Sequence, residues 1–87
     1  KTLRSGWIGF GRKSILFEDN FKDYVGSGWA LSTSSCTAAL HMALLANDIG
    51  LGDEVITTPL TFVATINAIA YTGATPVLAD IDPSTLN

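Results

Sequence analysis

The chain has few of the residues that build most metal-binding and polyanion-binding sites, namely cysteine, histidine, lysine and arginine. Its only cysteine, Cys36, cannot form an internal disulfide, and together with the only histidine, His41, it makes no cluster at metal-ligand spacing. No Lys or Arg occurs after Lys22. This absence argues against nucleic acid as a partner. Any anion bound by the later residues has to be held by backbone N–H groups and hydroxyls.

Long apolar runs and targeting signals are also missing. No run of apolar residues approaches the ~20 needed to span a membrane, and no signal-peptide pattern opens the chain, so we expect no membrane partner and a cytoplasmic location. Hydrophobic residues nevertheless make up 47% of the 87 residues and charged residues only 15%. Because so small a chain has much surface, this composition predicts faces that other polypeptide covers. We expect a fragment of a larger protein.

The order of the remaining patterns predicts an α/β fold. Residues 12–26 show helical spacing of aromatic residues and end at Gly26 and Gly28, so residues 1–28 are expected to form an N-terminal loop and helix. Residues 29–87 then alternate strand, helix, strand, helix, strand, which indicates a βαβαβ parallel sheet. The expected strands are "WALSTS", "EVITTP" and "TPVLADID". The expected helices cover residues 37–46, apolar nearly all round and thus buried on more than one side, and residues 62–72, capped by Thr61.

The first strand-to-helix junction is a candidate anion site. Ligands of open parallel sheets bind beyond the carboxyl ends of the strands, where helices begin. Here Ser34, Ser35, Cys36 and Thr37 stand at the start of a helix, where free N–H groups and the helix dipole favour an anion. Ordinary N-capping by serine or threonine explains the same residues equally well. The pattern lacks the glycines and the lysine of a Walker loop.

The second junction places an aromatic residue, Phe62, at the same edge of the sheet. Such a ring can stack on a flat cofactor, although an aromatic residue in an apolar helix stripe more often belongs to the core. Cys36 has no recognisable base beside it and is interpreted as a small packed residue, and His41 as a satisfied buried histidine. Asp82 precedes Pro83, which predicts turn capping by this carboxylate.

With these junctions placed, the order of motifs resembles one family throughout the chain. "SGWIGFG", "FEDNFKDYVG" and the run from "SSCTAALHMALL" through "GDEVI", "TFVAT" and "GATPV" to "DID" resemble the N-terminal part of the DegT/DnrJ/StrS-type sugar aminotransferases. These are pyridoxal 5'-phosphate (PLP) enzymes of fold type I, the aspartate aminotransferase superfamily. The resemblance implies that residues 29–87 begin the α/β large domain.

The resemblance also implies roles for individual residues. Ser35, Cys36, Thr37 and Ala38 match the segment that binds the cofactor phosphate, and Phe62 matches the aromatic residue stacked on the pyridine ring. Trp7 and Ile8 lie in a loop that matches the substrate side, near the nucleotide-linked sugar. Many members have glycine or alanine at the Cys36 position and small polar residues where Gly9 and Phe10 stand. Family members form homodimers with active sites built at the interface.

The catalytic residues that the resemblance implies are missing from this chain. Transamination needs a Schiff-base lysine and an acid paired with the pyridine nitrogen, and both match positions beyond residue 87. The expected parent transfers an amino group from an amino acid, often glutamate, to a keto sugar nucleotide, and the fragment alone is expected to be inactive. Two alternatives stay open: a sugar dehydratase or regulatory relative, in which histidine commonly replaces the lysine, and a non-catalytic α/β binding module.

Overall fold

The computed structural model describes residues 2–87 and divides the chain into two compact units, Lys1–Ser32 (unit 1) and Thr33–Asn87 (unit 2). Lys1, the first residue of the expected N-terminal loop and helix, lies outside the described residues. No helix within residues 2–87 combines the length and the apolar character needed to cross a membrane.

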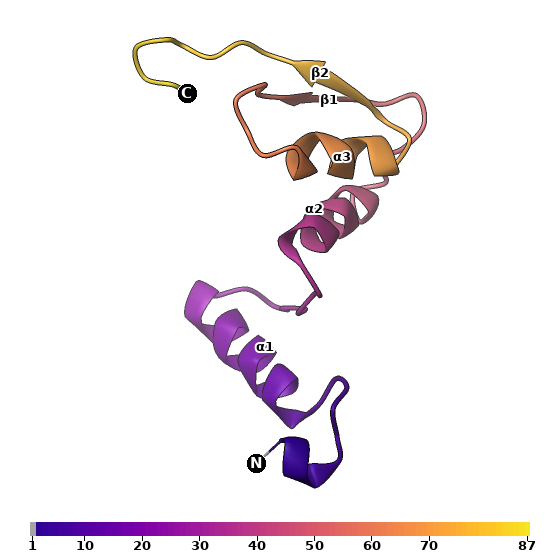
Figure 1. The fold of residues 1–87 in the computed structure, drawn as a ribbon, viewed down its shortest axis with the longest axis vertical. Helices are drawn as coiled ribbons and strands as arrows, with labels where there is room; N and C mark the ends of the chain where they lie inside the picture. Colours follow the sequence, from indigo (N-terminus) through magenta and orange to yellow (C-terminus); the bar gives the residue numbers. More distant parts are fainter. Residues whose placement is uncertain (1) are drawn as a thin grey trace. The chain divides into compact units, whose positions relative to one another are not determined.

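Unit 1 consists of a short 3-10 turn and one long helix (Figure 1). The turn η1 (Leu3–Ser5) ends at Gly6, and the helix α1 (Arg12–Val25) ends at Gly26. Both glycines adopt left-handed backbone, with φ of 72° and 70°, a conformation that costs glycine nothing. The predicted helix and its stop at Gly26 are therefore confirmed. Gly28 has no positive φ and takes no part in the stop.

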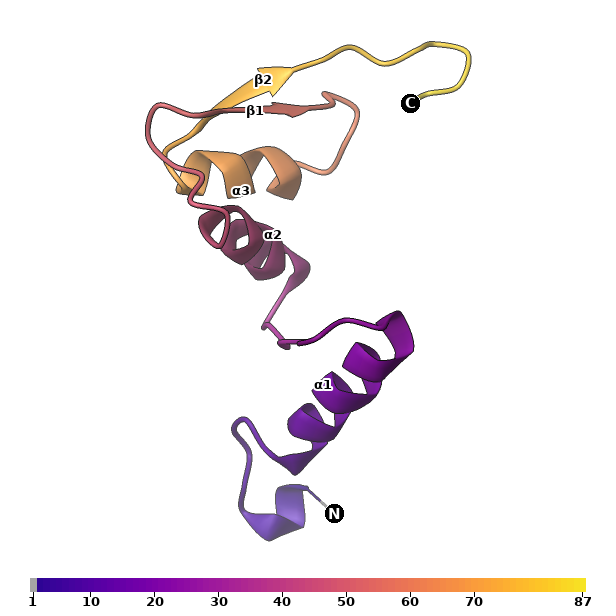
Figure 2. The same cartoon turned by 180° about the vertical axis from the view of Figure 1, so that it is seen from behind.

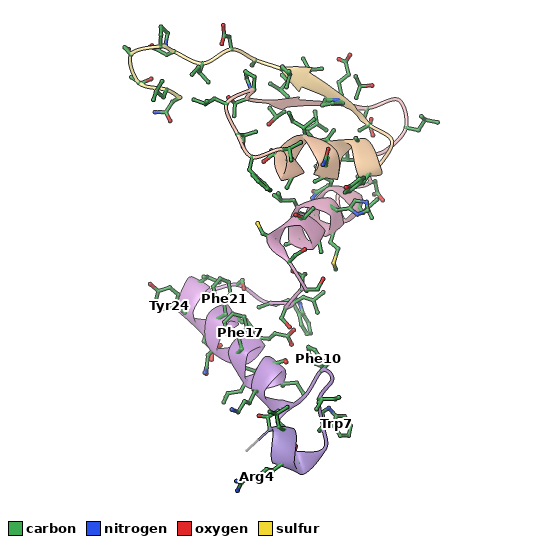
Figure 3. All side chains as sticks on the ribbon, viewed as in Figure 1. Arg4, Trp7, Phe10, Phe17, Phe21 and Tyr24 are labelled. Carbon is green, nitrogen blue, oxygen red and sulfur yellow. The ribbon has the colours of Figure 1, made fainter. Side chains whose placement is uncertain are left out.

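The aromatic residues of α1 follow one another at helical spacing, as the sequence predicts. Phe17, Phe21 and Tyr24 are drawn along this helix in Figure 3, and the rings of Phe17 and Phe21 lie 5.9 Å apart. All three remain exposed, at 59%, 48% and 89%. The stripe therefore contributes little burial within this chain.

Unit 2 is a parallel strand pair covered on one face by helices. The strands β1 (Glu54–Thr57) and β2 (Thr75–Leu78) pair in parallel, from Glu54 opposite Thr75 to Thr57 opposite Leu78. The crossover helix α3 (Ala64–Tyr71) packs on the strands, and α2 (Cys36–Leu45) packs on α3 (Figures 1 and 2). This β1–α3–β2 arrangement confirms the predicted parallel α/β fold.

The core of unit 2 is small. Only Ala68, Ile69 and Ala74 are buried among residues 2–87, at 1%, 3% and 6% exposure. Between α2, β1 and α3 a hollow of about 280 Å³ is lined mostly by apolar side chains such as Leu44 and Val55. The prediction that α2 is buried on more than one side is wrong for this chain. Only α3 packs on that helix, and Leu45 stays 50% exposed.

Two predicted details of the fold are also wrong. "WALSTS" forms no strand among the described residues, because a strand requires a neighbour to complete its hydrogen-bond ladder and the only sheet present is β1–β2. Thr61 does not cap α3, whose N-cap residue is Val63 without a side-chain cap. The Thr61 hydroxyl instead lies 3.2 Å from the Thr65 hydroxyl. The helix starts later than predicted, so Phe62 lies in the loop before it.

Candidate functional site

The start of α2 is built by local hydrogen bonds. Ser35 has an extended backbone (φ −162°, ψ 160°), and its side-chain oxygen accepts a hydrogen bond from the Ala38 amide at 3.1 Å. The Thr33 hydroxyl donates to the Ser35 carbonyl at 2.9 Å. Ser35 is thus the N-cap residue, which confirms the capping interpretation, and the helix begins at Cys36, one residue earlier than predicted.

Capping by Ser35 leaves other donors at this helix end. Within residues 2–87, the amides of Cys36 and Thr37 have no hydrogen-bond acceptor, as expected for the first turn of a helix. The positive end of the helix dipole lies at the same place. Cys36 is exposed and Thr37 half-buried. The two interpretations of this segment are therefore compatible, because the cap occupies the Ala38 amide and leaves those of Cys36 and Thr37 without an acceptor among the described residues.

The two strand-to-helix junctions of the chain share one end of unit 2. In Figures 1 and 2, α2 and α3 begin at the end of the unit where β1 and β2 finish. Phe62 precedes α3 at this end and is 78% exposed. The interpretation of Phe62 as a core residue is therefore wrong for this chain. Its ring is therefore accessible to a ligand.

The loop of unit 1 that carries Trp7 and Ile8 is ordered around the indole ring. Trp7 Nε1 donates to the Phe10 carbonyl at 2.7 Å, and Figure 3 shows the two side chains near the start of α1. A Cβ on Gly11 would stand 3.0 Å from the indole, so glycine permits this close approach. A hollow of about 900 Å³, lined in part by Trp7, Arg12 and Lys13, lies beside the ring. Ile8 is 79% exposed.

Two further residues named from the sequence differ from expectation. Cys36 is exposed rather than packed and stands at the first position of α2. His41 is half-buried rather than buried, and its ring meets that of Tyr71 edge-on at 5.7 Å, which joins α2 to α3. No group of three or more potential metal ligands occurs within residues 2–87.

The sequence patterns did not single out Glu18. It lies on the polar side of an amphipathic helix, where a carboxylate is ordinarily solvated. In the structure its Oε1 accepts hydrogen bonds from both the amide and the hydroxyl of Ser32. Nothing in the spacing of Glu18 and Ser32 predicts this contact.

Asp82 caps the turn that follows β2, as predicted. Its Oδ1 accepts hydrogen bonds from the amide and the hydroxyl of Ser84. The Ser84 hydroxyl, followed by the Ser84 amide, lowers the pKa of the Asp82 carboxyl. Because the folded pKa is the lower one, the turn is stabilised above the ordinary carboxyl pKa and loses this support as the pH falls through the folded value.

We therefore expect the Ser84 amide resonance to titrate with a midpoint below the ordinary aspartate value. An NMR pH titration of the isotope-labelled chain measures this midpoint and needs no folded core, because the contact spans only two residues. The Asp82→Asn variant keeps an oxygen acceptor without a titrating proton, so the transition should vanish from the Ser84 amide. A midpoint at or above the ordinary value would show that the Ser84 contact does not favour the charged carboxylate.

A comparison with known families gives one match over the whole chain. The sequence model of the DegT/DnrJ/EryC1/StrS aminotransferase family matches residues 1–87. The spore coat polysaccharide biosynthesis protein SpsC of Bacillus subtilis is 58% identical over 87 residues, which are 100% of this chain and 22% of that protein.

Solved structures agree with this match. The PLP-form of the putative sugar aminotransferase Spr1654 from Streptococcus pneumoniae superposes with a TM-score of 0.91 at 40% identity, over 98% of this chain and 22% of that one. An aminotransferase from Psychrobacter cryohalolentis gives a TM-score of 0.85 at 42% identity, over 93% and 21%. The chain thus spans about a fifth of the length of these relatives.

Proposed function

Because this chain belongs to the DegT/DnrJ/EryC1/StrS aminotransferase family, we propose that it is the N-terminal part of a PLP-dependent sugar aminotransferase. The whole enzyme transfers an amino group from an amino acid, with glutamate as the donor, to the keto group of a nucleotide-linked sugar. Its product serves amino-sugar, polysaccharide or antibiotic-sugar biosynthesis. The family match over the entire chain carries this proposal.

The donor set at the start of α2 supports a site for the cofactor phosphate. The amides of Cys36 and Thr37 have no acceptor among the described residues and the helix dipole favours negative charge, while no cationic side chain stands after Lys22. We assign Ser35, Cys36, Thr37 and Ala38 to the phosphate and the exposed ring of Phe62 to stacking on the pyridine ring. When bound, the cofactor supplies the electron sink for amino-group transfer.

The substrate side is assigned to the loop of unit 1. Trp7 is held by its hydrogen bond to the Phe10 carbonyl and presents an ordered aromatic surface beside the hollow that Arg12 and Lys13 help to line. With Ile8 it is proposed to contact the nucleotide-linked sugar. The exposed apolar side chains of this unit support a homodimeric enzyme in which such residues meet a second subunit.

A chimera tests the proposed function. In it, this chain replaces the matching residues of Spr1654, which covers 98% of the chain. The purified chimera is expected to bind PLP and, when glutamate is added, to convert it to the pyridoxamine phosphate form. Absorbance of the bound cofactor follows both steps.

Unaltered Spr1654 serves as the control for this experiment. The proposed function fails if the chimera unfolds at the same temperature as the control and yet takes up no cofactor. It fails in its donor assignment if the cofactor binds and glutamate leaves its absorbance unchanged.

A further inference from the structure

The hollow of about 900 Å³ in unit 1 lies beside the start of α1. Its lining combines an indole ring, two cationic side chains and a hydroxyl, which come from Trp7, Arg12, Lys13 and Ser14. This volume falls within the range of small-molecule sites, roughly 300–1,000 Å³. All residues that line it belong to unit 1, so the hollow is defined by that unit alone. Such a lining suits a ligand that carries both a flat group and an anion.

The charges near this hollow have one sign. Residues 1–17 contain four basic residues and no carboxylate, whereas all eight carboxylate side chains of the chain stand at Glu18 or later. Within residues 2–87, ion pairs form only at Lys22, with carboxylates of α1 itself. Arg12 and Lys13 are exposed and take part in none of them. Two cations that no neighbouring carboxylate offsets attract an anionic ligand.

The indole ring of Trp7 is held so that its surface stays available. Its Nε1 donates to the Phe10 carbonyl at 2.7 Å, and the Trp7 amide donates to Ser5 Oγ at 3.3 Å. Trp7 is nevertheless 67% exposed. Because the only N–H of the ring is already bonded, the ring offers a ligand its π-surface rather than a donor. Nucleobases stack on aromatic side chains through such a surface.

We propose that this hollow binds the nucleoside diphosphate part of the sugar nucleotide, with Arg12 and Lys13 on the diphosphate and the Trp7 ring against the base. The inference rests on the proposed function, in which this loop contacts a nucleotide-linked sugar, and it adds the two cations and the division of roles. Arginine and lysine form charge-assisted hydrogen bonds with phosphate oxygens. The chain thus binds two anions in different ways: the cofactor phosphate at backbone amides in unit 2, and the diphosphate at cationic side chains in unit 1.

Titration of the chimera described above with UDP and with GDP tests this assignment, and the tighter of the two serves as the probe. Arg12→Ala/Lys13→Ala is expected to weaken its binding about tenfold and to make the remaining affinity less sensitive to sodium chloride, because charge attraction is screened by salt. Trp7→Ala should also weaken binding about tenfold, through lost stacking, but should leave the salt sensitivity unchanged. The two variants therefore separate the cationic role from the aromatic one.

Arg4→Ala is the matched control. Arg4 is an exposed cation of the same unit that does not line the hollow, and Figure 3 draws it apart from Trp7. This variant should change the affinity for the diphosphate less than twofold. PLP affinity is measured for every variant and should stay the same. If the double variant does not fold, Lys13→Ala alone decides, with an expected loss of about threefold.

The outcomes that contradict this inference are distinct from those that contradict the proposed function. Equal affinity of the unaltered chimera and the double variant, an equal loss in Arg4→Ala, or full salt sensitivity in the double variant would each overturn the assignment of Arg12 and Lys13. So would a chimera that binds PLP but neither UDP nor GDP. Failure of the chimera to bind PLP would instead refute the proposed function, whatever the nucleotide titrations give.

Discussion

Replacing Ser35 with aspartate is expected to weaken PLP binding by the chimera strongly while leaving α2 capped. Aspartate and serine are comparable N-cap residues, so the hydrogen bond from the Ala38 amide survives. The added carboxylate, however, would stand beside the bound phosphate. Two unit charges about 4 Å apart repel by about 4 kcal/mol at an effective dielectric constant of about 20. Ser35 is exposed, so solvent screens part of this repulsion. A remaining repulsion of about 2 kcal/mol weakens PLP binding roughly 30-fold.

Ser35→Asn is the matched control for this variant. Asparagine caps a helix as well as aspartate does but carries no charge, so PLP affinity should change only a few-fold. Equilibrium titration of PLP and of pyridoxal measures both effects, and only PLP should respond to the aspartate. Equal PLP affinity in the two variants would mean that the start of α2 is a helix cap and nothing more.

The helix ends and the parallel topology were predictable because they depend on local chemistry. Gly26 ends α1 because its left-handed backbone suits glycine, and Ser35 begins α2 because its oxygen reaches an amide three residues later. Two short strands joined through a helix with short links favour a parallel pair. These signals lie within a few residues of the feature that they specify, so the sequence alone reveals them.

The features that were missed depend on contacts with distant polypeptide. "WALSTS" has the composition of a strand but forms none, because its pairing partner is absent from the sheet that residues 2–87 form. The apolar helix α2 and the ring of Phe62 likewise stay exposed, since burial depends on what packs against them. The Glu18–Ser32 contact escaped notice because hydrogen bonds between separate segments leave no periodic pattern. Of the candidate site, the residues at the two helix starts could be named from the sequence.

The second large effect is expected when the 87 residues are studied alone. Among residues 2–87 only one large apolar side chain, Ile69, is buried, together with Ala68 and Ala74. So little apolar burial cannot offset the conformational entropy lost on ordering the chain. The isolated chain should therefore lose its helical circular dichroism gradually in urea, with no cooperative step. It should also fail to transaminate, since no lysine follows Lys22.

The chimera provides the comparison, because there the same residues have the rest of the polypeptide around them. It should unfold in a sharp transition, and Ile69→Asp should move that transition to a clearly lower urea concentration, because an unpaired carboxylate would replace a large side chain that is already buried in this chain. A sharp urea transition of the isolated chain, or a cofactor absorbance band that shifts on borohydride reduction, would show that these residues fold and hold the cofactor without further polypeptide. Burial explains why the isolated chain and the chimera should differ. In the isolated chain α2 packs only on α3. A helix that is apolar nearly all round becomes stable when its remaining sides are also covered, as in the chimera.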